Sequence, residues 1–418
     1  MVKNLLFLIN LLHKWLKLLN RSLNGSQMVA FTFAMLILCG SLLLMLPMAS
    51  ADGSSMRFID ALFTATSTSC VTGLVVVDTG HYFSWFGKLV MIVLIQIGGL
   101  GIMTLTTLLS VAVGKRINLR ERLFIQESLN LNEPSGVVRL SLNVVKYALT
   151  IEFIFGTILA WHFYSALDMG LTGIAWGYWH AISAFCNAGF DILGTENNRY
   201  PSLTGYAGSP VINITIMLLI VIGGIGFLTW DDIFENKWRF HRYRMQSKVI
   251  LVTTGFLIFL PAMFFFFSDF SALPAGNRLL ASFFQSVTPR TAGFNTVNLS
   301  TMSGASQGVM ILLMLIGGSP GSTAGGMKTT TLAVLLANAT ATFRQRDSAR
   351  FFGRRVDCSA VKTAATILTM YLMLFFGGAV FISAYENLPL SACLYETASA
   401  VGTVGLTLGI TPQLRIPS

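Results

Sequence analysis

The stretch Phe63–Leu74, FTATSTSCVTGL, decides the fold because its outline recurs three more times along the chain. In every copy an aromatic residue is followed, after nine short and often polar positions, by glycine and then by Leu or Phe. The four glycines lie 116, 104 and 112 residues apart. A repeat of this kind in an apolar chain predicts four pseudo-equivalent re-entrant segments around one axis, which is how an ion-selective pore is built. The other three copies are Trp179–Phe190, Phe283–Phe294 and Tyr395–Leu406.

The composition is that of an integral membrane protein. Hydrophobic residues make up 54% of the 418 positions and charged residues only 11%, with a mean hydropathy of +0.68. These values are atypical of a soluble chain. Apolar runs, most of them long enough to cross about 30 Å of hydrocarbon, predict seven spanning segments. The predicted spans are Met28–Met48, Phe86–Val113, Val144–Trp161, Val211–Trp230, Val249–Phe267, Gly308–Leu336 with a glycine-rich break, and Ala364–Ala384.

The net charge of +10 is unevenly distributed along the chain. Of 28 Lys and Arg residues, 22 fall in the N-terminal segment and in Lys115–Lys146, Lys237–Lys248 and Lys328–Lys362. An excess of cations marks the cytoplasmic side of a membrane protein. The distribution therefore predicts that these basic stretches face the cytoplasm and that the four glycine motifs face outward. It also accounts for the charge without a nucleic-acid partner.

The segment 1–27 is predicted to lie at the membrane interface. Leu5–Arg21 is largely Leu, Ile and Phe, with basic residues toward its C-terminal half. Because no small-residue cleavage site follows a clean apolar core, the pattern favours an interfacial amphipathic helix over a signal peptide.

Each repeat is predicted to contain a spanning helix, a short helix that enters from outside and stops midway, a glycine-containing loop and a second spanning helix. The predicted fold class is an all-α polytopic membrane protein with four pseudo-repeats around a central pore. A period of roughly 110 residues places the repeats at 28–140, 141–247, 248–358 and 359–418. The short helices are predicted at Asp60–Ser69, Trp176–Phe185, Leu279–Thr288 and Ser391–Val401.

The loops after the short helices are the predicted ion-binding site. Four converging helix C-termini, each with partial negative charge, would stabilise a dehydrated cation. No carboxylate occurs in the loops, so backbone carbonyls would coordinate a monovalent ion, and glycine permits the backbone that this requires. Four ordinary glycine turns are the alternative. The predicted filter residues, whose carbonyls would bind potassium, are Val71, Thr72, Gly73, Asn187, Ala188, Gly189, Thr291, Ala292, Gly293, Thr403, Val404 and Gly405.

A Gly-Gly pair marks the second helix of three repeats, at Gly98-Gly99, Gly223-Gly224 and Gly317-Gly318. In the first two we interpret it as close helix packing. The third pair begins a stretch with five glycines and a proline in twelve residues, which predicts a broken span and a gate. Its lysine stands one position too late for a nucleotide-binding P-loop, and no strand precedes it. The predicted gate residues are Gly317, Gly318, Ser319, Pro320, Gly321, Ser322, Thr323, Ala324, Gly325, Gly326 and Lys328.

With these residues identified, the chain resembles the membrane subunit of the Trk/Ktr/HKT superfamily of potassium transporters over nearly its whole length. The single short N-terminal helix is more similar to the Ktr branch. That resemblance implies potassium uptake, stimulated by sodium, across the bacterial inner membrane. It also implies a homodimer with one pore in each subunit, resting on a ring of nucleotide-binding cytoplasmic subunits of the Ktr A or Trk A type. The matching strips are Val71–Leu74, Asn187–Phe190, Thr291–Phe294 and Thr403–Leu406.

The resemblance has further implications for single residues. Glycine in all four strips implies potassium rather than sodium, and the family's gating loop maps onto Gly317–Lys328. Arg290 is expected to support the filter through a buried ion pair rather than to touch the ion. The first three filter glycines precede a Gly-Gly pair by 25, 34 and 24 residues, so a fourth such span is expected to pass about position 430. Because the chain ends at Ser418, we expect the last helix of the fourth repeat, with an arginine beneath the filter, to be missing.

Several alternatives stay open. Glu152 lies within a predicted span and is either functional or held by a buried hydrogen bond. Asp78 and Asp191 follow the first two glycine motifs and either ring the outer mouth or are solvated loop residues. A cation-coupled secondary transporter would need buried acids along a path, and an inactive truncated fragment is the third possibility. An enzyme is not indicated, because the five histidines, the five cysteines and two GxSxG strings lack the spacing or context of catalytic or metal sites.

Overall fold

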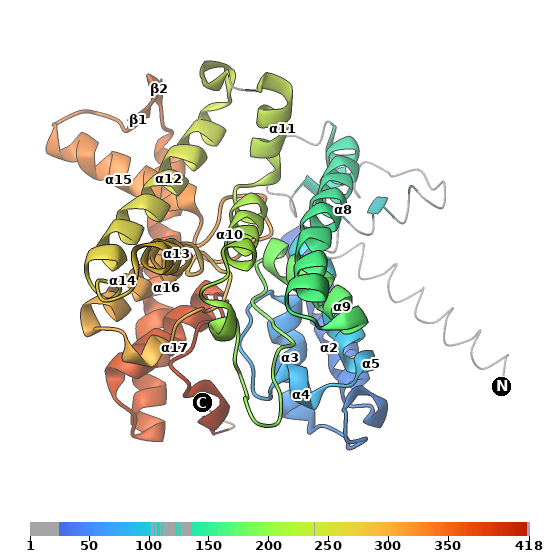
Figure 1. Ribbon diagram of the computed structural model, residues 1–418. Helices are drawn as coiled ribbons and strands as arrows, with labels where there is room; N and C mark the ends of the chain where they lie inside the picture. The colour runs from blue at the N-terminus through green and yellow to red at the C-terminus, as the bar shows by residue number, and fades with distance from the viewer. Residues whose placement is uncertain are drawn as a thin grey trace.

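The computed structural model describes residues 25–101, 136–237 and 239–415, together with isolated positions between 104 and 126. The predicted interfacial helix and most of Lys115–Lys146 lie outside the described residues. The regular secondary structure of the described part is almost entirely helical, with loops between the helices (Figure 1). Its helices are α2 (Gly25–Leu44), α3 (Phe58–Ser69), α4 (Thr79–Tyr82), α5 (Trp85–Leu100), α8 (Val137–Trp161), α9 (Gly170–Phe185), α10 (Pro210–Gly224), α11 (Phe227–Asn236), α12 (Met245–Phe267), α13 (Ala275–Val287), α14 (Gly304–Leu315), α15 (Thr329–Phe343), α16 (Cys358–Glu386) and α17 (Leu390–Gly402), and the strands β1 (Arg350–Phe351) and β2 (Arg354–Arg355) form a small hairpin.

Among the described residues, four helices are long and apolar enough to cross a membrane, and a bent pair makes up to a fifth span. The predicted break in the third repeat is present, because α14 ends at Leu315 and α15 begins at Thr329. The four long segments are Ser26–Leu44, Val137–Ser165, Met245–Phe267 and Cys358–Glu386.

The second repeat departs from the sequence prediction. We expected a span at Val211–Trp230, and the helices α10 and α11 found there meet at 98°, so this segment is a bent pair and not one straight helix. The bend lies at Gly226, whose φ of +93° suits only glycine. The N–H of Phe227 then donates to the carbonyl of Gly321 over 2.6 Å instead of continuing the helix.

A short helix follows each of four long helices and packs against it, in the pairs α2 with α3, α8 with α9, α12 with α13 and α16 with α17 (Figure 1). The short helices have 12, 16, 13 and 13 residues, fewer than the roughly 20 needed to cross a bilayer. A helix is therefore present at each of the four predicted places, and each begins a few residues earlier than predicted.

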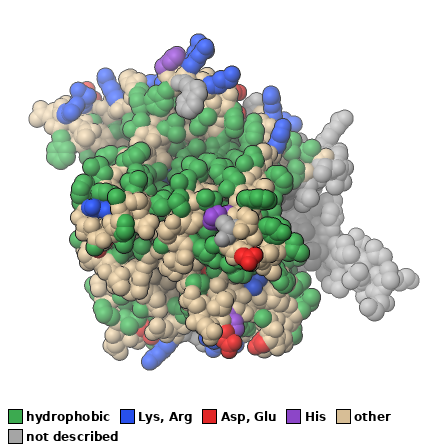
Figure 2. All heavy atoms as spheres, in the orientation of Figure 1, with side chains coloured by type: hydrophobic (Ala, Val, Ile, Leu, Met, Phe, Trp, Pro, Cys, Tyr) green, Lys and Arg blue, Asp and Glu red, His purple; other side chains and the backbone are tan. Residues whose placement is uncertain are grey.

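The outer faces of the long helices carry exposed hydrophobic side chains, as expected of a surface in contact with lipid. Phe259 on α12 and Met373 on α16 are 61% and 69% exposed. Figure 2 shows a broad hydrophobic belt across one face, with Lys and Arg side chains gathered mainly at its upper edge. That edge holds α11 and the β1–β2 hairpin in Figure 1.

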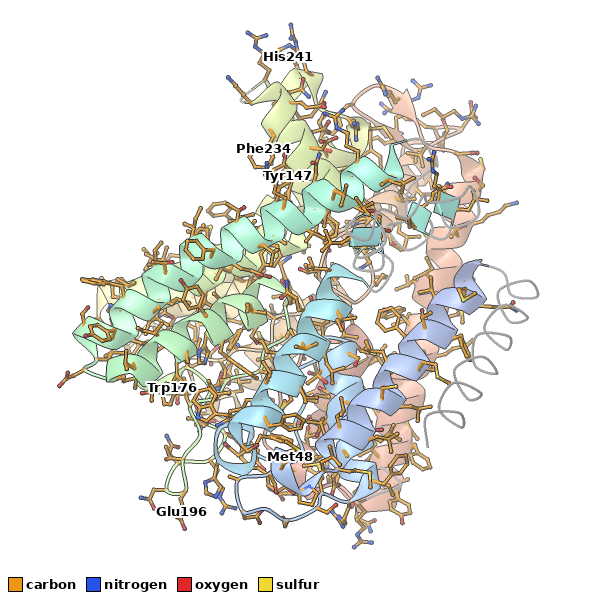
Figure 3. The ribbon with its side chains drawn as sticks, turned by 90° about the vertical axis from the view of Figure 1, so that its right-hand side faces the viewer. Met48, Tyr147, Trp176, Glu196, Phe234 and His241 are labelled. Carbon is orange, nitrogen blue, oxygen red and sulfur yellow. The ribbon has the colours of Figure 1, made fainter. Side chains whose placement is uncertain are left out.

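The two ends of the molecule are distinct. Figure 3 shows His241 at one end and Met48 and Glu196 at the other. At the His241 end, Tyr147 of α8 stacks on Phe234 of α11 with ring centroids 4.8 Å apart, which fixes the bent helix against α8. The basic stretch that contains His241 and the basic hairpin therefore lie at the same end of the helices.

The first two Gly-Gly pairs allow helices to approach the ends of the short helices. A Cβ atom on Gly98 would overlap the carbonyl oxygen of Ser69, and one on Gly99 would lie 2.7 Å from the Sγ of Cys186. A Cβ on Gly223 would overlap the carbonyl oxygen of Phe185. The predicted close packing is thus confirmed, and it brings α5 and α10 against the points where α3 and α9 end.

Candidate filter and gate

The four loops that follow the short helices share one backbone conformation. Two residues before each glycine the chain enters the left-handed region, with φ between +52° and +64°, and the glycines themselves have φ between +69° and +92°. A residue with a side chain in this region costs of order 1–3 kcal/mol, and the cost is greater for the β-branched residues found at three of the four places. One strained geometry repeated four times indicates a shared role. The left-handed residues two positions before the glycines are Val71, Asn187, Thr291 and Thr403.

A repeated hydrogen bond turns the short helix into its loop. The N–H group of Thr72 donates over 2.8 Å to the carbonyl of Ser67, five residues earlier, and that of Ala188 donates over 2.7 Å to Ser183. The fourth loop repeats this bond over 2.8 Å. The pattern is that of a helix C-cap with a left-handed residue, which satisfies the last carbonyls of the helix and redirects the chain.

Hydroxyl side chains also tie each loop to its helix. Ser67 Oγ donates to the carbonyl of Leu74 over 2.7 Å, and Ser183 Oγ donates to that of Phe190 over 2.8 Å. Thr288 makes the equivalent bond in the third loop. These bonds fix the residue after each filter glycine and hold the loop extended beside its helix.

These hydroxyl residues were not among the predicted site residues. In the fourth loop, Ser399 Oγ accepts the N–H of Gly405 over 3.0 Å. The available signal was a serine six positions before the glycine in three of the four copies. The aromatic residue that defined the motif has no common role, because Trp179 donates to the carbonyl of Phe190 over 3.2 Å whereas Phe63 is 36% exposed.

The four filter glycines form a closed ring. A Cβ atom built on any of them would lie 2.5 Å or less from the carbonyl oxygen of the residue that precedes the glycine of another loop. Real Cβ atoms essentially never approach other atoms within 3.0 Å, so the ring requires glycine at all four places. Each loop meets the next one along the chain, and the fourth meets the first. The contacts pair Gly73 with Ala188, Gly189 with Ala292, Gly293 with Val404, and Gly405 with Thr72.

The carbonyl groups of these loops are available to a ligand. Between described residues, no hydrogen bond is accepted by the backbone carbonyl of any of the predicted filter residues. Buried backbone carbonyls are otherwise nearly always paired, because an unpaired one costs free energy. Carbonyl oxygens gathered from four sides and left unpaired are suited to replace the hydration shell of a monovalent cation.

A cavity of about 350 Å³ lies on one side of the ring, and all four glycines line it. Asp78 and Asp191 line it as well. Asp78 accepts hydrogen bonds from the N–H groups of His81 and Tyr200, over 2.8 and 2.5 Å, and Asp191 accepts one from Leu193 over 3.0 Å. The sequence left open whether these two acids surround the mouth of the pore or are solvated loop residues. The structure places both at the mouth of the ring.

The stretch Gly317–Lys328 forms an irregular loop between α14 and α15, on the side of the ring away from this cavity. A Cβ atom on Gly325 would overlap the hydroxyl of Thr403, next to the fourth filter strip. Thr323 Oγ1 donates over 2.8 Å to the carbonyl of Phe185, where α9 ends. The loop therefore contacts two opposite members of the ring and lies across its inner side.

Hydrogen bonds hold this loop against the second repeat and also form within the loop itself. The N–H of Ser319 donates over 2.9 Å to the carbonyl of Gly224, and Lys328 Nζ donates over 2.7 Å to that of Ala324. A second cavity of about 220 Å³ lies between the loop and the end of α3. The loop is thus bonded to the second repeat through Ser319, Gly321 and Thr323, with free volume beside it.

Arg290 differs from expectation. Within the described part of the chain it forms no ion pair with a carboxylate, so the predicted buried ion pair is wrong there. The guanidinium group donates to Thr254 Oγ1 over 3.3 Å, and its Nε has no partner among the described residues. The carbonyl of Arg290 instead accepts from Asn187 Nδ2 over 3.1 Å, so its main chain contacts the second strip.

Glu152 is held by a buried hydrogen bond. Both of its carboxylate oxygens lie within reach of Gln96 Nε2, at 3.0 and 3.1 Å, and the side chain is buried between α5, α8 and α9. Glu152 lines neither the cavity of about 350 Å³ nor that of about 220 Å³. The buried position of Glu152 is thus separate from both cavities.

Known proteins resemble the chain over most of its length. The TrkH family, described as "Cation transport protein", matches residues 6–417. The "Potassium/sodium uptake protein NtpJ" of Enterococcus hirae is 38% identical over 409 residues, which cover 96% of this chain and 89% of that protein. The "Ktr system potassium uptake protein B" of Bacillus subtilis is 38% identical over 394 residues, covering 93% and 86%. The crystal structure of the potassium transporter TrkH from Vibrio parahaemolyticus shares the fold, with a TM-score of 0.72, 19% identity and coverage of 92% of this chain and 76% of that one.

Proposed function

The chain belongs to the TrkH family of cation transport proteins, and from this premise we propose that it takes up potassium through the ring of four loops. It is a multi-pass membrane protein of a transporter family, not an enzyme. The observation that carries the proposal is the closed ring of glycines whose loops hold unpaired carbonyl groups. Such a ring discriminates among cations by replacing water with a fixed set of oxygen ligands.

The proposed pathway has three parts in series. Cations gather in the cavity that Asp78 and Asp191 line, lose water at the ring, and pass the loop Gly317–Lys328 when it withdraws. The cavity faces outward in this proposal, because the basic stretches lie at the opposite end of the helices (Figure 3). The free volume beside the loop supports its role as the gate.

The proposed ion is potassium, and sodium is proposed to stimulate uptake. Glycine at all four strips supports potassium, since some sodium-preferring plant relatives of the resembled family carry serine in the first strip, where this chain has Gly73. The names of the two similar proteins mention potassium in both cases and sodium in one. We further propose a homodimer with four pore repeats per chain, regulated by a ring of nucleotide-binding cytoplasmic subunits.

The proposal is tested in a bacterial strain that lacks its own potassium uptake systems. The strain expresses this chain together with a Ktr-type cytoplasmic subunit, and growth and rubidium uptake are measured at low external potassium. We expect growth to be restored and rubidium to enter. Absence of both, with the chain inserted in the membrane, would overturn the proposal, whereas uptake that follows a proton gradient rather than membrane voltage would favour a coupled transporter.

Asp191 is expected to make uptake depend on external pH. Burial raises the pKa of the Asp191 carboxyl to about 7, with a smaller contribution from the charge of Asp78, and the N–H of Leu193 opposes the shift. The carboxyl is therefore mostly neutral at pH 6 and mostly charged at pH 8, and only the charged form attracts cations. The potassium concentration that gives half-maximal uptake is expected to be about three- to tenfold higher at pH 6 than at pH 8.

The matched variants are Asp191→Asn and Glu196→Gln. Asp191→Asn is expected to show the pH 6 value at both pH values. Glu196 lies in the same connection but is exposed, at the far end of the molecule in Figure 3, so Glu196→Gln should leave the pH dependence intact. If Asp191→Asn keeps the pH dependence of uptake, then a titratable group other than Asp191 is responsible for that dependence.

A further inference from the structure

We propose that Asn187 and Thr323 couple the gate loop to the filter, so that the position of the loop sets how well the filter distinguishes potassium from sodium. This inference rests on the proposed function, because it assigns the loop Gly317–Lys328 to the gate and the four strips to the filter. It goes beyond that function in making the gate a determinant of selectivity as well as of flux.

The side chain of Asn187 joins two filter strips. Its Nδ2 donates to the carbonyl of Arg290 over 3.1 Å and lies 3.5 Å from Thr291 Oγ1, which is the residue equivalent to Asn187 in the third strip. Asn187 is 1% exposed and has a φ of +57°. Because water is excluded, each of these bonds has a larger effect on the local structure than an exposed bond would have.

The other end of the same amide faces the gate loop. Thr323 Oγ1 lies 3.4 Å from Asn187 Oδ1 and donates over 2.8 Å to the carbonyl of Phe185, two residues before Asn187. A hydroxyl group has one proton, so it satisfies either acceptor at a given moment. Both acceptors belong to the junction between α9 and the second strip, and Thr323 is itself only 5% exposed.

Glycines make this contact possible. A Cβ atom on Gly223 would lie 2.8 Å from Thr323 Oγ1 and 3.0 Å from Asn187 Oδ1. The N–H of Thr323 also donates to the carbonyl of Gly223 over 3.2 Å. The Gly-Gly pair of the second repeat thus leaves space in which the loop and the strip meet directly.

Among the described residues, the other three strips form no hydrogen bond with the loop. Val71, at the same position in the first strip, has no polar side-chain group. The hydroxyl of Thr291, in the third strip, lies near Asn187 Nδ2 and forms no hydrogen bond with the loop among the described residues. In the fourth strip the hydroxyl of Thr403 is buried and has no hydrogen-bond partner among the described residues, although the loop lies against it. The link between loop and filter therefore runs through the second strip.

Withdrawal of the loop changes the energy of the filter. When Thr323 leaves, the carbonyl of Phe185 and Asn187 Oδ1 lose a buried donor, which favours a rearrangement of the amide that also bonds the third strip. Coupling of this kind is reciprocal, so an ion that stabilises the closed-loop geometry of the filter also stabilises the closed loop. A plug without this connection would change the flux of all ions by the same factor.

The test measures potassium and sodium flux through the purified chain in liposomes of bacterial phospholipid. Thr323→Val keeps the size of the side chain and removes the hydroxyl. We expect it to raise total flux and to lower the ratio of potassium to sodium flux, each by about threefold or more. Thr323→Ser, which retains the hydroxyl, should behave as the unmodified chain. The same is expected of Thr342→Val, because the exposed Thr342 lies outside the gate loop and its lost hydroxyl donates to the carbonyl of Asn338 within α15.

A double variant separates coupling from two independent effects. Asn187→Leu is expected to lower the flux ratio as Thr323→Val does, and the two changes together should have no larger effect than either alone. Equal increases of potassium and sodium flux in Thr323→Val, or effects that multiply in the double variant, would overturn the inference. If the Asn187→Leu variant does not insert into the membrane, the comparison of Thr323→Val with Thr323→Ser tests the inference by itself. Failure of the unmodified chain to carry potassium would instead contradict the proposed function.

Discussion

Replacing Gly293 by alanine is expected to lower potassium uptake by about a hundredfold or more. A Cβ atom there would lie 2.5 Å from the carbonyl oxygen of Val404 and within 3.3 Å of the Cα atoms of Gly189 and Gly405, so three loops must move. Overpacking costs roughly 1–3 kcal/mol, and a φ of +80° adds about 1–2 kcal/mol for a residue with a Cβ. A combined cost of about 3 kcal/mol at the ion site corresponds to more than a hundredfold in binding. The measurement is the initial rate of rubidium uptake, normalised to the amount of protein in the membrane.

Gly308→Ala is the matched control for this prediction. Gly308 lies in α14 of the same repeat, and a Cβ there would meet nothing within 4 Å. Alanine is also the better helix former, so uptake should be unchanged. Uptake by Gly293→Ala at the rate of the unmodified chain would show that the ring of glycines is not the path of the ion.

The four loops were predictable because their constraint is local. A chain that leaves a short helix, turns through a left-handed residue and passes another backbone closely needs glycine at one fixed offset. A glycine therefore recurs at the same offset in every repeat, at Gly73, Gly189, Gly293 and Gly405. The serine anchors were also visible, at six positions before the glycine in three of the four copies, but the third copy places its hydroxyl at Thr288 and so weakens the pattern.

The features that the sequence analysis missed depend on partners distant in the chain. The run Val211–Trp230 has the composition of one continuous span. The helix bends where the N–H of Phe227 donates to the carbonyl of Gly321, and neighbouring residues in the sequence do not predict this distant partner. Arg290 was expected to form a buried ion pair beside the filter, because a cation in the path would repel the permeant ion. Its observed partner is the hydroxyl of Thr254 on α12, 36 residues away. Local sequence determines which torsions are favourable, whereas the choice among distant partners follows from the assembled fold.

Deletion of Ser319–Gly325 is expected to raise potassium flux through the purified chain in liposomes by about tenfold or more, because it removes the segment that lies across the inner side of the ring. The ends of the deleted segment already meet. The N–H of Gly317 donates to the carbonyl of Met327 over 2.8 Å, and a Cβ on Gly317 would lie 2.6 Å from the Cα of Gly326. Joining Gly318 to Gly326 therefore need not pull α14 and α15 apart.

Increased flux alone does not show that the ion still passes the filter, since a damaged membrane protein also leaks. Combining the deletion with Gly293→Ala separates these cases. If the loop only blocks the path, ions in the deletion variant still have to pass the ring. The deletion combined with Gly293→Ala should then lose the added flux. A leak around the ring would persist in the combined variant. Flux that the deletion leaves unchanged would mean that the closed loop does not obstruct the path, and the bonds from Ser319 to Gly224 and from Thr323 to Phe185 would then serve only to hold the broken helix in place.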